Sequence, residues 1–195
     1  MDKKQEVANF HILRWHELPD LDLYMDQVVS VIERCLGSFV ASEDAKIITP
    51  TMINNYVKQR IITPPINKKY SKKHLSALII ICILKRFMPL SEISDGIAML
   101  LEERTPQEAY DLFCAAIERE LSVAFGMETM LDLHLQPVEI QAVYAMARAF
   151  SNIVFAHAIL EEKRENSHLF EEAEASVDFS EKKEKSKKDK KGTKN

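Results

Sequence analysis

The apolar run from Leu75 to Leu84 constrains the fold of this chain more than any other stretch. Ser71 can cap a helix that contains this run, and Lys85 and Arg86 suit its C-terminal end, where the helix dipole favours positive charge. Pro89 then marks a break, because proline cannot continue a helix. A helix that is apolar on nearly all sides has to be surrounded by other elements. The sequence therefore predicts a central core helix.

A shorter helix is predicted between Thr49 and Arg60. Thr49 suits the N-cap, and Pro50 suits the first helical position, where its missing N–H costs nothing. At about 100° per residue, one side of this helix is apolar and the other carries hydroxyl, amide and amino groups. The polar side consists of Thr51, Asn54, Asn55, Lys58 and Gln59.

The segment between these two helices predicts a small β-hairpin or wing. Pro64 and Pro65 cannot continue a helix, and the Lys68-Lys69-Tyr70 segment after them is strand-like. His74, in the first turn of the core helix, is expected to face solvent or to contact phosphate.

Charge is strongly segregated along the chain, although the formal net charge is only −4. Residues 45–91 contain nine basic and no acidic residues, whereas residues 1–44 contain four basic and nine acidic ones. A basic stretch in an otherwise acidic protein is the electrostatic footprint of a phosphate-binding face. A solvated lysine-rich surface is the alternative interpretation.

The helix, the Pro-Pro break and the Lys-Lys-Tyr segment resemble the winged helix-turn-helix of the MerR regulator family. Ile53–Ile62 is similar to the family's recognition helix and the residues after it, 68–71 to the end of its wing, and 90–93 to the start of the next helix. The chain departs from the family pattern at Arg60, where glycine usually ends the helix, at Asn67, which replaces a wing tyrosine, and in the long loop before Thr49.

The whole chain also resembles a family of uncharacterised bacterial proteins with a domain of unknown function, marked by the segment Leu18–Gln27. The MerR resemblance implies a recognition helix in the major groove of DNA and a basic wing on its phosphates. The DNA-binding residues expected from the polar arc and the resemblance are Thr51, Asn54, Asn55, Tyr56, Lys58, Arg60, Lys68, Lys69, Tyr70, Lys72 and Lys73.

Helix signals also predict the elements around this region. Apolar residues recur at helical spacing from Asp20 to Leu36, with Gly37 as a stop, which gives the supporting helix of the helix-turn-helix. Its apolar set is Leu21, Tyr24, Val28, Val31, Ile32 and Cys35. A fourth helix is predicted over Ser91–Glu103, with Ser91 as its cap.

Two further helices are predicted after Arg104. Thr105, Pro106 and Glu108 form a capping sequence for the first of them, and Gly126 can end it. The second runs from Pro137 to about Arg164 and has a seam of small residues, which suits either intramolecular packing or a subunit interface. The seam consists of Ala142, Ala145, Ala149 and Ala156.

The expected fold is all-α with a small β-wing, namely a MerR-like winged helix-turn-helix followed by a C-terminal helical hairpin. Residues 1–17 are expected to be a semi-ordered arm, 18–104 the DNA-binding domain and 105–167 the helical C-terminal domain. Residues 168–195 are predicted to be disordered, because their charged composition cannot bury apolar surface.

Catalytic and metal-binding motifs are not found in the sequence. Cys35, Cys82 and Cys114 stand singly among apolar residues, which predicts reduced, buried thiols rather than disulfides or metal ligands. We expect no enzyme activity, no cofactor and no metal, although an active site assembled only in space stays an alternative. The N-terminus lacks an apolar signal core and the 75–84 run is too short to span a bilayer, so a cytoplasmic protein without a membrane partner is expected.

The function expected from these features is sequence-specific DNA binding by a transcription regulator. Its partners would be double-stranded DNA and a second copy of the chain, held through the C-terminal helices. An adaptor that uses the same helix-and-wing surface for a protein partner is the alternative. The C-terminal half contains no recognisable effector motif, so a small-molecule effector stays unknown.

Overall fold

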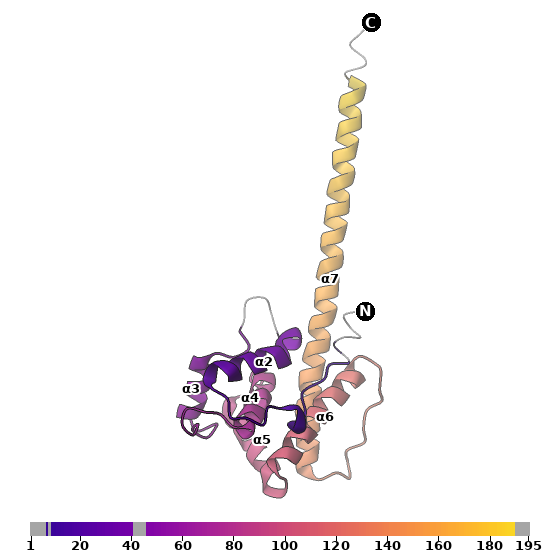
Figure 1. Cartoon of the computed structure of the whole chain (residues 1–195). Helices are drawn as coiled ribbons and strands as arrows, with labels where there is room; N and C mark the ends of the chain where they lie inside the picture. The colour runs from indigo at the N-terminus through magenta and orange to yellow at the C-terminus, as the bar shows by residue number, and fades with distance from the viewer. Residues whose placement is uncertain (1–6, 8, 41–45, 190–195) are drawn as a thin grey trace. The chain divides into compact units, whose positions relative to one another are not determined.

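The computed structural model describes residues 7, 9–40 and 46–189, with residues 38–40 and 165–189 as backbone only. Within these residues the chain is mostly helical and contains isolated β-bridges but no strand (Figure 1). The expectation of an all-α fold is confirmed, whereas a β-wing built from strands is not shown. The elements are η1 (Trp15–Glu17), α2 (Met25–Val40), α3 (Pro50–Lys58), α4 (Lys72–Leu84), α5 (Leu90–Glu103), α6 (Pro106–Ala124) and α7 (Val138–Asp189).

Helix α4 is the predicted central core helix. Ten of its thirteen residues are buried, on all sides of the helix. It contacts α2, α5 and α6, and Figure 1 shows it among these helices. Each fully buried Leu or Ile side chain is worth about 1.5–3 kcal/mol, so this helix is a main source of the stability of the fold.

Helix α2 differs from its prediction at both ends. Leu23 and Tyr70 exchange two backbone hydrogen bonds, with N···O distances of 2.9 and 2.8 Å, so the chain before Met25 is extended rather than helical. At the other end α2 continues through Gly37 to Val40. Glycine within a helix costs only about 1 kcal/mol relative to alanine, which tertiary packing readily offsets.

Most predicted caps are confirmed. The Thr49 hydroxyl oxygen accepts a hydrogen bond from the Met52 N–H at 3.2 Å, and the Glu108 carboxylate accepts one from the Thr105 N–H at 2.8 Å. The cap predicted at Ser91 is wrong, because α5 begins one residue earlier and Pro89 occupies its N-cap position.

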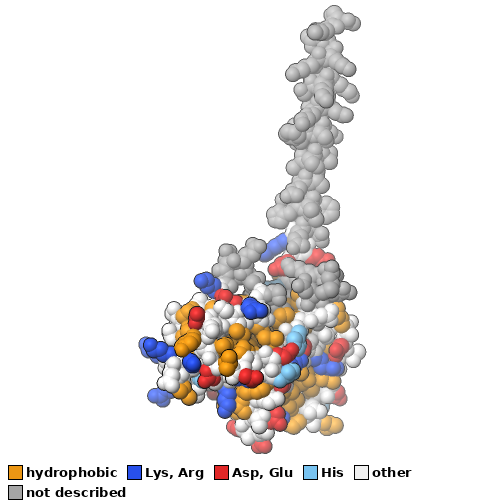
Figure 2. Space-filling model, in the orientation of Figure 1, with side chains coloured by type: hydrophobic (Ala, Val, Ile, Leu, Met, Phe, Trp, Pro, Cys, Tyr) orange, Lys and Arg blue, Asp and Glu red, His pale blue; other side chains and the backbone are white. Residues whose placement is uncertain are grey.

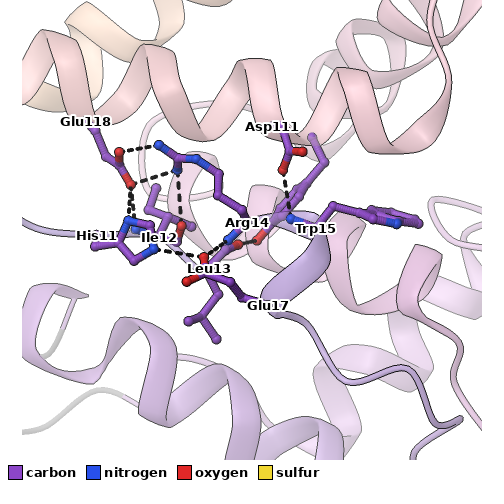
Figure 3. A network of polar contacts seen from close by, with 9 residues as sticks. His11, Ile12, Leu13, Arg14, Trp15, Glu17, Asp111 and Glu118 are labelled. Carbon is purple, nitrogen blue, oxygen red and sulfur yellow. Dashed lines mark hydrogen bonds and ion pairs between the residues drawn. The ribbon is translucent and has the colours of Figure 1, made fainter.

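Residues 9–17 of the N-terminal arm pack along α6, whereas residues 1–6 and 8 of the segment predicted to be semi-ordered lie outside the described residues. Ile12 and Leu18 are buried. Figure 3 shows the polar network that holds the arm: the Ile12 N–H donates to Glu118 at 2.7 Å, and the Trp15 N–H donates to Asp111 at 2.7 Å. Both carboxylates belong to α6, about a hundred residues away in sequence, so no local pattern could indicate them.

Glu118 and Arg14 form the main ion pair of this network. The Arg14 guanidinium donates to both carboxylate oxygens of Glu118, one of them at 2.8 Å, and both side chains are largely buried. Burial by itself would lower the pKa of Arg14, but the hydrogen bond and the charge of Glu118 raise it above its usual value. The Tyr110 hydroxyl also donates to the Leu13 carbonyl at 2.8 Å.

The chain divides into two compact units, Met1–Ile153 and Val154–Asn195. The position predicted for a domain boundary, between residues 104 and 105, lies inside the first unit. The start of α7 packs in this unit through Val143, Ala147 and Phe150, and Arg148 donates to the buried Glu120 at 2.8 and 3.1 Å. That hydrogen bond raises the pKa of Arg148.

The second unit contains the rest of α7, which extends to Asp189 instead of ending near Arg164. The backbone of residues 168–189 is therefore helical, in contrast to the predicted disordered tail, and residues 190–195 lie outside the described part. Charged composition argues against burial but not against a helix, because lysine, glutamate and alanine all have high helix propensity.

The exposed residues of α7 include most of the small-residue seam. Ala145, Ala149 and Ala156 are exposed and Ala142 is half-buried, so packing among the described residues leaves most of the seam uncovered. The segment Val138–Arg164 is also long and apolar enough to cross a membrane by length and composition, a test that some core helices of soluble proteins pass as well. The expectation of no membrane partner rested on the 75–84 run, which is shorter than this segment.

Candidate nucleic-acid interface

The polar side of α3 is exposed, as its spacing predicts. Thr51, Asn54, Asn55 and Lys58 face solvent, whereas Ile53 is fully buried on the opposite side. About two turns of helix thus present two amides, a hydroxyl and an ammonium group together. These are the side-chain types that donate to and accept from base edges and phosphates.

Two residues expected in the site lie in the core instead. Tyr56 is only 5% exposed and Tyr70 only 3% exposed, so neither ring can contact a partner in this structure. Burial raises the pKa of both hydroxyls. Their role is to support the surface: Tyr56 anchors α3, and Tyr70 pairs with Leu23 through the backbone.

The C-terminal end of α3 is a Schellman motif with Arg60 in the left-handed conformation, at φ 60°. The Ile61 N–H donates to the Tyr56 carbonyl at 2.9 Å, and the Arg60 N–H donates to the Val57 carbonyl at 3.0 Å. This motif normally places glycine at the left-handed position. Arginine therefore occupies the left-handed position that glycine normally takes in this motif.

A two-residue turn stands where the wing is expected. Asn67 and Lys68 have φ values of 50° and 63°, and Ile66 and Lys69 exchange hydrogen bonds of 3.1 and 2.9 Å around them. Positive φ at both central residues defines a type I′ turn, the tightest β-hairpin connection. Lys68 is exposed at the tip of this turn.

The lysines of the site fall into two groups. The Lys69 ammonium lies 5.2 Å from the centre of the Tyr24 ring, and Lys72 forms an ion pair with Asp20 and lies 5.8 Å from the Trp15 ring. Lys58, Lys68 and Lys73 are exposed and have no such contact within the described residues. Lys58, Lys68 and Lys73 are thus available to a partner, whereas Lys69 and Lys72 contact other residues of the chain.

His74 is buried and not exposed to solvent or phosphate, contrary to the prediction. Its Nδ1 accepts a hydrogen bond from the Ser71 N–H at 3.0 Å, and its Nε2 lies 3.0 Å from the Thr63 hydroxyl. Its ring also meets the Tyr70 ring edge-on, with 5.6 Å between centres. His74 therefore ties the segment before the turn to the start of α4.

A hollow of about 490 Å³ adjoins the end of α3 and was not indicated by the sequence. Arg60 lies at its wall, together with residues from the first turns of α5, which are thirty residues further along the chain. The lining residues are Gln59, Arg60, Ile61, Leu90, Ser91, Ser94 and Asp95. The surface around α3 is therefore recessed on this side.

Large apolar side chains are also exposed near this surface. Leu21 is 79%, Tyr24 52% and Ile66 74% exposed. Leu21 and Tyr24 were predicted to face the core. They precede the first residue of α2, Met25, so the helical spacing of α2 does not apply to them. Figure 2 shows Lys and Arg side chains at the edge of the molecule that carries α3, with hydrophobic side chains beside them.

Reactive groups of other kinds are few in the described part of the chain. No cluster of three or more His, Cys, Asp and Glu side chains there could hold a metal ion. The three cysteines are free and buried, as predicted. Burial raises the pKa of the Cys82 thiol to about 11 and that of the Cys114 thiol to about 12, so neither is a nucleophile at neutral pH.

Comparison with known proteins gives one family. A family model described as "Domain of unknown function (DUF1836)" matches residues 13–113, which extend from the N-terminal arm into α6. No curated protein and no solved structure matches the chain. Because the matched region is more than half of the 195 residues and includes α3, the turn and the central helix, the chain belongs to the DUF1836 family.

Proposed function

We propose that this protein is a sequence-specific DNA-binding transcription regulator with a MerR-like winged helix-turn-helix. In this proposal α2 is the supporting helix, α3 lies in the major groove, and the 66–69 turn serves as a short wing. The observation that carries the proposal is the separation of charge. Residues 45–91 have nine basic and no acidic side chains, and several of the basic ones are exposed, namely Lys58, Arg60, Lys68 and Lys73.

Base reading is assigned to Asn54 and Asn55, which are exposed on α3. An asparagine amide can pair with the N6 and N7 atoms of adenine through two hydrogen bonds, and such a contact is worth about 1–3 kcal/mol of discrimination. Thr51 and Lys58 flank the two amides and complete the proposed reading side of the helix.

Phosphate binding is assigned to Arg60, Lys68 and Lys73, with Lys58 at the edge of the reading side. Their side chains are exposed, and each neutralised phosphate should add about 0.9 to the slope of log affinity against log salt concentration. Lys69 and Lys72 were expected in this set, but their contacts with Tyr24, Asp20 and Trp15 favour a structural role.

A salt titration of the intact protein with duplex DNA tests the proposal. We expect steep salt dependence on random duplexes and, once a preferred sequence is selected from a random pool, a loss of preference in Asn55→Ala that exceeds its loss of non-specific affinity. Ser30→Ala, on the exposed side of α2, is the matched control. Salt-independent binding, or a parallel fall of specific and non-specific affinity in Asn55→Ala, would argue against the assignment.

A protein-binding adaptor is the second candidate, supported by the exposed Leu21, Tyr24 and Ile66. Apolar side chains with exposures of 52–79% are typical of a protein interface and contribute little to phosphate binding. The two candidates separate in the same titration, because an apolar interface would lose little affinity as salt rises.

We also propose a cytoplasmic homodimer. A single helix and turn make a small footprint, and modules of this size commonly need a second half-site. The exposed alanines of α7 support an interface there, since small residues let two helices approach closely. Membrane insertion of Val138–Arg164 is less favoured, because it would have to withdraw Val143 and Phe150 from the core and Arg148 from Glu120.

A further inference from the structure

Arg60 and Lys68 share an unusual backbone conformation. Their φ values of 60° and 63° lie in the left-handed region. Residues other than Gly, Asn and Asp rarely occupy it, because the Cβ atom of an L-residue approaches the carbonyl oxygen there. Arg60 stands at the position after the C-cap of α3, and Lys68 at the second central position of the type I′ turn. Glycine is the preferred residue at both positions.

The same chain uses glycine where the motif of Arg60 recurs. At the end of α6, Gly126 has φ 75°, the Met127 N–H donates to the Ser122 carbonyl at 2.8 Å, and the Gly126 N–H donates to the Val123 carbonyl at 3.0 Å. These bonds match those around Arg60 within 0.1 Å. The backbone motif therefore does not require arginine, and the arginine adds strain to it.

Contacts within the chain do not explain the two side chains. Arg60 and Lys68 are both exposed, and neither side chain has a hydrogen-bond or ion-pair partner among the described residues. A left-handed residue whose cationic side chain is unpaired within the described part of the chain costs backbone strain without an internal contact that offsets it. Strain of this kind is commonly held at functional sites, where the side chain meets a ligand.

We infer that Arg60 and Lys68 are the two principal phosphate contacts of the α3 surface, held in left-handed positions at a cost in stability. This inference rests on the proposed function and deepens it, because it selects two of the nine basic residues of the 45–91 stretch as the main determinants of affinity. Arg60 follows the C-terminal end of α3 and Lys68 lies at the tip of the turn, so each would bind one phosphodiester of a DNA duplex.

Glycine substitution should separate the cost in stability from the contribution to DNA affinity. Arg60→Gly and Lys68→Gly should each raise the melting temperature of the full chain by about 2–4 °C, since each relieves left-handed strain in a protein of this size. Each should lower the salt slope for a 20-base-pair random duplex by about 0.9, which corresponds to about eightfold weaker binding at 0.1 M salt. The double variant should show both effects additively, because the two side chains share no partner.

Three controls make the result specific. Arg60→Asn tolerates the left-handed conformation but lacks the charge, so it should reproduce the loss of affinity. Arg60→Lys keeps charge and strain and should leave both measurements near their original values. Gly126→Ala introduces strain into the matching motif of α6, so it should lower the melting temperature and leave DNA binding unchanged.

The outcomes distinguish this inference from the proposed function. If Arg60→Gly and Lys68→Gly raise the melting temperature but leave the slope unchanged, while the original protein binds DNA steeply, the inference is overturned and the proposed function stands. A melting temperature that falls in both variants overturns the claim of strain. If the original protein shows no salt-dependent affinity for duplex DNA, the proposed function fails first.

Discussion

Substituting Glu118 by alanine should release the N-terminal arm from α6. One carboxylate accepts from the Ile12 N–H at 2.7 Å and from the Arg14 guanidinium through both of its oxygens, and it lies 3.2 Å from His11 Nδ1. Each hydrogen bond to a charged group contributes about 1.5–3 kcal/mol, but bonds to one carboxylate are not additive.

The expected decrease in the free energy of unfolding follows from the burial of the Arg14–Glu118 ion pair. The side chains of Arg14 and Glu118 are 22% and 21% exposed, between a surface pair worth about 0–1 kcal/mol and a buried pair whose disruption costs about 3–5 kcal/mol. We expect Glu118→Ala to lower the free energy of unfolding by about 2–3 kcal/mol. The bonds from Trp15 to Asp111 and from Tyr110 to Leu13 remain, so the arm should loosen without unfolding the protein.

Urea denaturation measures the decrease in the free energy of unfolding, and amide hydrogen exchange at Ile12 shows whether the arm has loosened. Glu118→Gln keeps an acceptor for the Ile12 N–H but not the charge, so it should protect the Ile12 amide better than alanine does. Glu128→Ala, in the segment after α6, is the matched control, because its pair with Arg119 is 33% and 44% exposed and should contribute about 0–1 kcal/mol. Equal losses in Glu118→Ala and Glu128→Ala, with unchanged exchange at Ile12, would refute the reasoning.

Three further predictions concern other parts of the chain. Thr105→Ala should cost about 1 kcal/mol of stability in urea titrations through loss of the α6 cap. The Thr105 N–H and hydroxyl also lower the pKa of Glu108, so this carboxylate stabilises the fold above its usual pKa, and the stabilisation is lost as pH falls through the lowered value. A Thr105→Ala variant that loses stability in acid as much as the original protein would contradict this. Cys82 and Cys114, with pKa values of about 11 and about 12, should resist a thiol reagent at pH 8 until denaturant is added, and rapid modification of the native protein would show that the core opens there. Light scattering should find a dimer at micromolar concentration that Ala149→Glu converts to a monomer; an intact protein that stays monomeric, free and on DNA, would end the proposal of an α7 interface.

Sequence alone determined the elements whose signals are local. The caps at Thr49 and Thr105 act within three residues. The apolar run around Leu78 predicts a buried helix because Ser71 precedes it and Lys85 and Arg86 follow it. The polar side of α3 followed from its periodicity, because its apolar side fixes the rotation of a short amphipathic helix. The charge segregation of residues 45–91 likewise needs no coordinates.

Tertiary structure decided which of the predicted residues are available to a partner. The buried His74, the ion pair of Lys72 with Asp20 and the pairing of Leu23 with Tyr70 join segments up to 52 residues apart, and composition carries no information about such partners. The exposure of the α7 alanines depends in the same way on which face of the helix the core covers.

Arg60 is the clearest example of a feature that the sequence could not determine. The sequence marks it as an exception, since glycine is expected there, but a residue name does not specify a backbone angle. Only the structure shows that the chain keeps the left-handed conformation with arginine in place. The physical reason is that φ at this position is set by hydrogen bonds to Tyr56 and Val57 and by packing of α3 on the core, and these forces outweigh the preference of a single residue.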